Sequence, residues 1–404
     1  MSDYTKAIEI NPGYAAAYNN RGLVYWDKGQ YDQAISDFTK AIEINPGDAA
    51  AYNNRGGTYG ERGQYDQAIS DFTKAIEINP GDAEAYYNRG ITFGERGQND
   101  QAISDYTKAI EINPGDAKAY YNRGITFGER GQNDQAISDY TKAIEINPGY
   151  AAAYNNRGLV YWDKGQYDQA ISDFTKAIEI NPGDAAAYNN RGGTYGERGQ
   201  YDQAISDFTK ATEINPRDAK AYYNRGITFR ERGQNDQAIS DYTKAIEINP
   251  GYAEAYYNRG NTFGERGQND QAISDYTKAI EINPGDAAAY NNRGLVYGMK
   301  GQHDQAISDF TKATEINPRD AKAYYNRGKT YGERGQYDQA ISDYTKAIEI
   351  NPRYAGAYNL RGFIYYFKGE YEKSLKDVKK AQSLGCQISP RLLEALRKAL
   401  GGKK

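Results

Sequence analysis

Apolar residues return in two helical stripes at a fixed interval along almost the whole chain. In the stretch 15–48 the first stripe has the helical spacing i, i+4, i+7 and consists of Tyr18, Gly22 and Tyr25. The second stripe is wider and consists of Ala34, Ile35, Phe38, Ala41 and Ile42. The pattern predicts two helices in each unit. Neither helix can bury its stripe alone, so neighbouring units must stack.

Local signals predict where these helices begin and end. Gly29 ends the first helix, because glycine adopts positive φ without steric cost. Asn45-Pro46 ends the second helix, since proline disfavours helix in the residue before it. Asp48 is placed to cap the next helix by accepting a backbone N–H in its first turn.

Proline allows the units to be counted. The evenly spaced prolines are Pro12, Pro46, Pro80, Pro114, Pro148, Pro182, Pro216, Pro250, Pro284, Pro318 and Pro352. Half a unit, containing the second helix only, occupies 1–14. Ten near-identical units occupy 15–354, a divergent eleventh occupies 355–388, and 389–404 is expected to form a C-terminal capping helix and tail. The predicted fold class is all-α, a solenoid of helix-turn-helix units.

The unit resembles the tetratricopeptide repeat (TPR). Within 15–48, Tyr18-x2-Arg21-Gly22-x2-Tyr25, Ala34-x3-Phe38 and Pro46 follow the TPR spacing, with Tyr for the usual Trp and Arg for the usual Leu. The resemblance covers essentially the whole chain. It implies a right-handed superhelix with the first helix of each pair lining the concave side. It also implies binding of other proteins or extended peptides.

Composition excludes several classes of function. Mean hydropathy is −0.90, and no apolar run is long enough to span a bilayer, so no membrane insertion is expected. Cys386 is the single cysteine and cannot form an internal disulfide. A formal net charge of −4 gives no general attraction to nucleic acid. One His and one Cys argue against a metal site, and we expect no cofactor.

The candidate binding residues lie on the first helix of each unit. The sixth place is Asn in all ten close copies: Asn20, Asn54, Asn88, Asn122, Asn156, Asn190, Asn224, Asn258, Asn292 and Asn326. Such a column can pair with the amides of an extended peptide. It resembles the asparagine ladder in the repeat superhelix of O-linked N-acetylglucosamine transferase. Alternatively, these amides bond to the neighbouring unit and only set the stacking.

Two further sets of groove candidates vary between copies. The fifth place, elsewhere Asn, is Tyr at Tyr87, Tyr121, Tyr223, Tyr257 and Tyr325, and the second place is Lys at Lys118, Lys220 and Lys322. The lysines lie three units apart, too dispersed for the carboxylate clamp of co-chaperone TPR domains. Near the end of the first helix, glycines such as Gly60 and Gly128 either hollow the groove or mark fraying toward the turn.

The two ends differ from the array. Residues 366–404 hold ten Lys or Arg and four Asp or Glu, which could recruit an anionic partner. The simpler interpretation is a capping helix from Ser389-Pro390 that covers the last unit with Leu392, Leu393, Leu396 and Leu400. At the other end, 1–14 leaves Tyr4, Ala7 and Ile8 partly bare. Either an upstream segment is missing, or a homodimer forms through this end.

No catalytic constellation is found. The Asp and Glu residues recur once per unit on faces expected to meet solvent, so we expect a protein that is not an enzyme. The leading hypothesis is a cytoplasmic protein-interaction scaffold that holds an extended peptide or protein segment in its concave groove. The alternative is a structural or self-assembling rod without a dedicated ligand. Residues 2–75 recur unchanged as 138–211, and such uniformity favours the rod.

Overall fold

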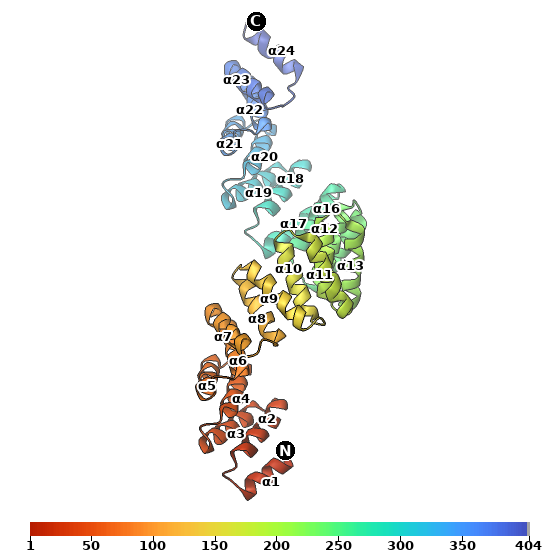
Figure 1. Cartoon of the computed structure of the whole chain (residues 1–404). Helices are drawn as coiled ribbons and strands as arrows, with labels where there is room; N and C mark the ends of the chain where they lie inside the picture. Colours follow the sequence, from red (N-terminus) through yellow and green to blue (C-terminus); the bar gives the residue numbers. More distant parts are fainter. Residues whose placement is uncertain (402–404) are drawn as a thin grey trace. The chain divides into compact units, whose positions relative to one another are not determined.

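The computed structural model describes residues 1–401, and every regular element in that range is an α-helix. The helices fall into two compact units that meet in the sequence between Gln200 and Tyr201. Figure 1 shows the order of the helices along the chain.

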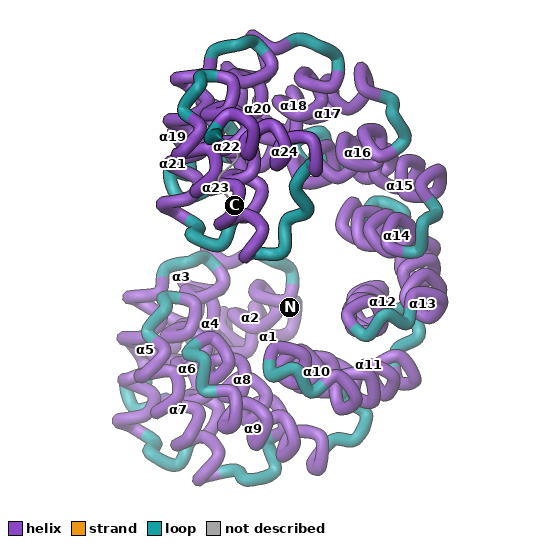
Figure 2. The backbone as a smooth tube through the Cα atoms, turned by 90° about the horizontal axis from the view of Figure 1, so that it is seen from above, coloured by secondary structure: helices purple, strands orange, loops and turns teal. Residues whose placement is uncertain are grey.

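The first unit consists of α1 to α12. Their bounds are α1 (Ser2–Ile10), α2 (Ala15–Asp27), α3 (Tyr31–Ile44), α4 (Ala49–Glu61), α5 (Tyr65–Ile78), α6 (Ala83–Glu95), α7 (Asn99–Ile112), α8 (Ala117–Glu129), α9 (Asn133–Ile146), α10 (Ala151–Asp163), α11 (Tyr167–Ile180) and α12 (Ala185–Glu197). Even-numbered helices are the first of each pair and odd-numbered helices the second. Within this unit, from α2 to α12, the even-numbered helices line the inner side of the curve and the odd-numbered helices the outer side (Figure 2).

The second unit continues the alternation. Its helices are α13 (Tyr201–Ile214), α14 (Ala219–Glu231), α15 (Asn235–Ile248), α16 (Ala253–Glu265), α17 (Asn269–Ile282), α18 (Ala287–Met299), α19 (His303–Ile316), α20 (Ala321–Glu333), α21 (Tyr337–Ile350), α22 (Ala355–Phe367), α23 (Tyr371–Ser383) and α24 (Pro390–Ala399). The predicted all-α solenoid of helix pairs is confirmed in both units.

In most pairs a glycine packs against an aromatic ring; in the pair α22 and α23, Gly362 faces Val378 instead. A Cβ on Gly22 would lie 2.6 Å from Cε1 of Phe38, closer than atoms can approach, so only glycine lets α2 and α3 pack at this distance. Phe38 is fully buried with Ala34 and Ala41. The same geometry recurs in most of the following pairs, and it confirms that the glycine of the TPR pattern serves close helix packing.

The loop between pairs is built by side chains that bond to the backbone. Asn45 Oδ1 accepts from the Gly47 N–H at 3.2 Å, which shapes the turn after α3. Asp48 Oδ1 then accepts from the N–H groups of Ala50 and Ala51 at 3.1 and 3.3 Å. The predicted N-cap is therefore confirmed. Gly29 has φ 68° after α2, as predicted.

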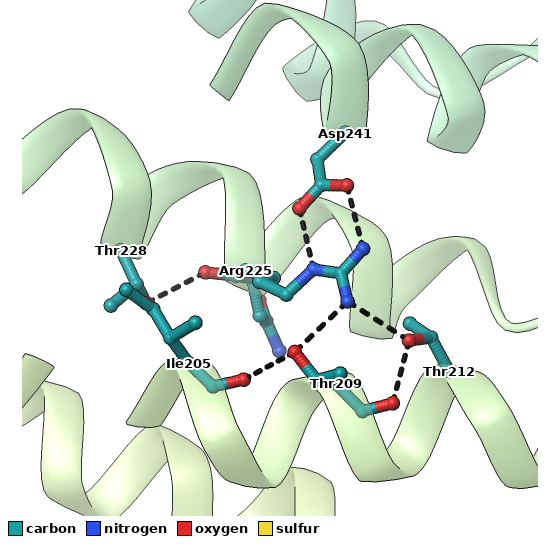
Figure 3. A network of polar contacts seen from close by, with 7 residues as sticks. Ile205, Thr209, Thr212, Arg225, Thr228 and Asp241 are labelled. Carbon is teal, nitrogen blue, oxygen red and sulfur yellow. Dashed lines mark hydrogen bonds and ion pairs between the residues drawn. The ribbon is translucent and has the colours of Figure 1, made fainter. Parts of the chain in front are cut away.

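An arginine on each first helix joins its pair to the pair before it through an ion pair and hydrogen bonds. The position of its aspartate partner corrects one expectation. The expectation that the acidic residues meet solvent is wrong for one column of aspartates, which begins with Asp37 and Asp71. These aspartates are only 4–6% exposed. In the example of Figure 3, Asp241 accepts two hydrogen bonds from Arg225, at 2.7 Å from Nε and 2.8 Å from Nη2. Arg225 Nη1 donates to the hydroxyls of Thr209 and Thr212 on α13, each at 3.1 Å. The Arg that replaces the usual Leu of the TPR pattern is thus structural.

The last helix covers the end of the array. Leu392 and Leu396 of α24 are 6% and 0% exposed and pack with Val378 and Ala381 of α23. Leu393 and Cys386 are partly buried against the same cluster.

Candidate functional site

The predicted asparagine column lies on the first helices of the pairs, and its amide nitrogens bond between pairs. Asn54, Asn88, Asn190 and Asn326 donate from Nδ2 to the Oδ1 atoms of Asn19, Asn53, Asn155 and Asn291, at 3.0, 3.3, 3.0 and 2.9 Å. Asn122, Asn156, Asn258 and Asn292 donate to the hydroxyls of Tyr87, Tyr121, Tyr223 and Tyr257, at 2.8, 3.0, 2.8 and 3.0 Å. Asn20 is exposed and Asn224 is half-buried. The column therefore contributes to stacking.

These bonds leave part of each amide available. Within residues 1–401 no group donates to the Oδ1 atoms of Asn54, Asn88 and Asn122, and none of these atoms is a buried oxygen that lacks a partner. An asparagine has two N–H donors and an acceptor oxygen, so one N–H can hold the stack while the oxygen meets a ligand. Stacking and ligand binding are compatible at this place.

The fifth-place tyrosines pack within their own pair. The ring of Tyr121 lies 5.9 Å from that of Tyr140 and 4.8 Å from that of Tyr150, measured between centroids. Burial raises the pKa of Tyr121, while its hydrogen bond from Asn156 opposes that shift. Tyr87, Tyr223, Tyr257 and Tyr325 make the matching contact at 5.9–6.0 Å.

This packing explains a sequence correlation that is not visible in any single unit. The five close copies with Tyr in the fifth place also have Tyr in the twenty-fourth place, as at Tyr106, whereas the five with Asn have Phe there, as at Phe38. The paired places lie on the two helices of one unit, and the rings are in contact in the Tyr type. Comparing the two places across the ten units would have found the pair.

The predicted lysines are exposed in the first turns of α8, α14 and α20. Lys118 lines one hollow of about 1040 Å³ together with Tyr87, Asn88, Glu84 and Tyr150. Of the predicted site residues, this hollow therefore brings together one lysine, one tyrosine and one asparagine. Lys220 and Lys322 belong to the second unit and do not share it.

A second hollow, which we call the Trp26 hollow, has a volume of about 430 Å³ and is lined mainly by residues of α2, α4 and α6. Its apolar lining includes Leu23, Trp26 and Ile91; its polar lining includes Asn53, Asn54, Asn88, Glu61, Glu84 and Glu95. Leu23 and Trp26 are 37% and 40% exposed, unusual for large apolar side chains.

Glycines open this hollow. A Cβ on Gly57 or Gly60 would meet nothing within 4 Å, and both glycines lie inside the regular helix α4. Gly60 is the penultimate residue of α4, so both interpretations of such glycines, hollowing of the groove and fraying toward the turn, stay predictions. Asn53, Glu61 and Glu95 of this hollow were not among the predicted residues. The thirteenth place is Glu in seven of the ten close copies, including Glu61 and Glu95. Such a uniform column gives no sequence signal that separates a binding role from a structural one.

The part of the chain that the structure describes contains neither a metal-binding group nor a helix suited to span a membrane. Between residues 1 and 401 no group of three His, Cys, Asp or Glu residues could hold a metal ion. None of the twenty-four described helices has the length and apolar character that a bilayer crossing requires.

Comparisons with known families match the repeat along the chain. Models described as "Tetratricopeptide repeat" match residues 13–80, 83–116, 105–138, 151–184, 185–218, 208–240, 287–320, 321–354 and 343–376. A model described as "TPR repeat" matches 126–165, 226–267 and 260–301. A comparison with curated protein sequences gives no significant match.

Several solved structures resemble this chain in both fold and sequence. The structure titled "YrrB: a TPR protein with an unusual peptide-binding site" is 30% identical, with a TM-score of 0.41, over 46% of this chain and 95% of that one. MamA is 33% identical, with a TM-score of 0.39, over 43% of this chain and 94% of its own. A tetratricopeptide repeat protein from Parabacteroides merdae is 25% identical, with a TM-score of 0.46, over 62% of this chain and 99% of its own.

Proposed function

The chain belongs to the tetratricopeptide repeat family, and on that premise we propose that it is a scaffold that binds an extended peptide or protein segment along the inner side of its first helices. The observation that carries this proposal is the Trp26 hollow, where exposed apolar side chains, open glycines and available amide oxygens lie together. Apolar surface with a few placed hydrogen-bonding groups is typical of a ligand site.

The second candidate is a rod without a dedicated ligand. It is favoured by the hydrogen bonds that at least eight of the asparagines donate to the preceding pair. These bonds give the column a structural use. They do not account for exposed Leu23 and Trp26 beside open space, so we favour the binding scaffold.

The test is capture of peptides from an unbiased library of extended peptides. The intact chain is compared with the double variant Gly57→Leu and Gly60→Leu, which fills the open space without touching the stacking bonds. Leucine has higher helix propensity than glycine, so the variant should be at least as stable as the intact chain. We expect the intact chain to capture peptides that the variant no longer captures. If the intact chain captures nothing, the rod becomes the better account.

A second copy of the chain is a further proposed partner, through α1. No residue of α1 is buried, and Met1 and Ile10 are 39% and 85% exposed. Sedimentation over a range of concentrations tests this homodimer, and a constant monomer mass would reject it. A cytoplasmic location stays a prediction, to be checked by microscopy of the tagged chain.

A further inference from the structure

We propose that the Trp26 hollow takes a segment of a partner protein in which a bulky apolar side chain is flanked by lysine or arginine. The proposal rests on the scaffold function, because it assigns the partner's chemistry at one place on the inner side. It stands on three features of the hollow: its apolar space, its unused hydrogen-bonding groups and its charge.

The space fits an apolar side chain. Leu23 and Trp26 on α2 and Ile91 on α6 lie around the part of α4 that has glycine at Gly57 and Gly60. Since a Cβ at either glycine would meet nothing within 4 Å, the space above α4 is free of side chains from the described chain. A leucine, phenylalanine or similar side chain placed there would remove Trp26 and Leu23 from water.

Hydrogen-bonding groups in the hollow match an extended backbone. Asn53 is only 7% exposed; its Oδ1 accepts from Asn88 at 3.3 Å, while its own Nδ2 donates to no group in residues 1–401. Asn53 Nδ2 is not a buried donor that lacks a partner, so it is open to an acceptor from outside the chain, such as a peptide carbonyl. Asn54 and Asn88 present acceptor oxygens for peptide N–H groups in the same hollow.

The charge of the hollow selects the flanking residues. Glu61, Glu84 and Glu95 line it, no lysine or arginine does, and none of the three glutamates has an ion pair among the described residues. The nearby Arg62 and Arg96 are already paired with Asp32 and Asp66. Burial, followed by the negative charge of Glu61, raises the pKa of Glu95, as expected for carboxylates that lack a cation. Lysine or arginine on the partner would supply that cation.

The chain contains its own control for this site. Leu159, Trp162, Gly193 and Gly196 repeat Leu23, Trp26, Gly57 and Gly60 in an identical stretch of sequence, and Trp162 is 39% exposed. Beyond that stretch the two copies differ in sequence, with Lys220 at the place of Glu84 and Arg230 at the place of Gly94, so the three glutamates of the Trp26 hollow are not repeated as a set. We therefore expect a basic segment to prefer Trp26 over Trp162.

Tryptophan fluorescence tests the proposal directly, because Trp26 and Trp162 are the only two tryptophans. In the full chain with Trp162→Phe, Trp26 reports alone; in the matched chain with Trp26→Phe, Trp162 reports alone. The probe is a short acetylated and amidated Gly/Ser peptide with one leucine flanked by lysines. We expect a saturable change in Trp26 emission that weakens with added salt, and no change for Trp162.

Two control peptides and one variant separate the contributions. Replacing the lysines of the peptide by glutamates, or its leucine by serine, should weaken binding about tenfold or more. The triple variant Glu61→Gln, Glu84→Gln and Glu95→Gln should weaken binding of the lysine peptide by a similar factor with unchanged helicity and melting. Equal binding of the glutamate peptide, or unchanged binding by the triple variant, would overturn the assignment.

The failure of this proposal can be told apart from failure of the scaffold function. If the library experiment yields bound peptides but none of them alters Trp26 emission, the partner binds elsewhere and the assignment to this hollow is wrong. If neither experiment detects a bound peptide, both proposals fail.

Discussion

Glycine serves opposite purposes at two places on one helix, α8. A Cβ at Gly124 would lie 2.9 Å from Cε1 of Tyr140, whereas one at Gly128 would meet nothing within 4 Å. The first glycine is required by packing. The second relieves no contact within the described chain, and its role in opening the groove stays a prediction.

Alanine at these two places should therefore have opposite effects. Gly124→Ala should lower the free energy of unfolding by about 1–3 kcal/mol, because the added methyl group overpacks the ring contact. Gly128→Ala should raise it by up to about 1 kcal/mol through helix propensity. Denaturant unfolding followed by circular dichroism measures both. Destabilisation by Gly128→Ala would show that this place is packed.

A buried and an exposed ion pair of neighbouring repeats should differ in how much they contribute to the free energy of unfolding, measured by the same denaturant unfolding. Arg123 and Asp139 are only 16% and 7% exposed in their side chains and are joined at 2.7 Å, whereas Asp100, paired with Arg130, is 81% exposed. Asp139→Asn should cost about 2–4 kcal/mol, because it removes the charge that compensates a largely buried guanidinium. Asp100→Asn should cost about 0.5 kcal/mol or less. Equal effects would contradict the structural role of the Arg column.

At the scale of the element, the first helices differ in how they begin. Asp48 caps α4 through its side chain, but Tyr14, Tyr150, Tyr252 and Tyr354 occupy the same place before α2, α10, α16 and α22 and form no such cap. Three of these tyrosines pack against the fifth-place tyrosine of the preceding pair, as Tyr150 does against Tyr121. Tyr14 is 50% exposed.

Replacing an N-cap tyrosine by aspartate should stabilise the chain only where the tyrosine ring has no aromatic partner. Tyr14→Asp should raise the free energy of unfolding by about 1 kcal/mol, the usual contribution of an N-cap. Tyr150→Asp should gain less or lose stability, because the new cap is offset by loss of the contact with Tyr121. Thermal melts of the two variants check this, and equal gains would show that the ring contact contributes nothing.

At the scale of the molecule, each helix packs mainly on its neighbours in the sequence within its compact unit. Stability in such an array is close to a sum of local terms. Damage at one end should therefore stay near that end.

Leu396→Ala tests this locality. Leu396 lies on α24 and is fully buried against α23, so its truncation should cost about 2–5 kcal/mol at the end of the array. Hydrogen exchange should accelerate in α22 and α23, while amides in α4 to α9 keep their protection. Uniform acceleration along the chain would mean that the array unfolds as one cooperative body.

The sequence by itself determined the repeat period, the two helices of each unit, the turns at Gly29 and Asn45-Pro46 and the N-cap at Asp48. These features depend on helical periodicity and on backbone preferences within a few residues, so they are readable in one unit. Family membership followed from the same local spacing.

Only the tertiary structure decided where the polar side chains are used. Asp37 is buried because its partner Arg21 lies on the other helix of the pair, and Asn54 bonds to Asn19 in the unit before it. The Trp26 hollow needs three helices, from three successive units, to bring Trp26, Glu61 and Glu95 to one place. Contacts between units depend on the stacking geometry, which the pattern within a unit does not contain. The ligand role of the asparagine column accordingly stays a prediction.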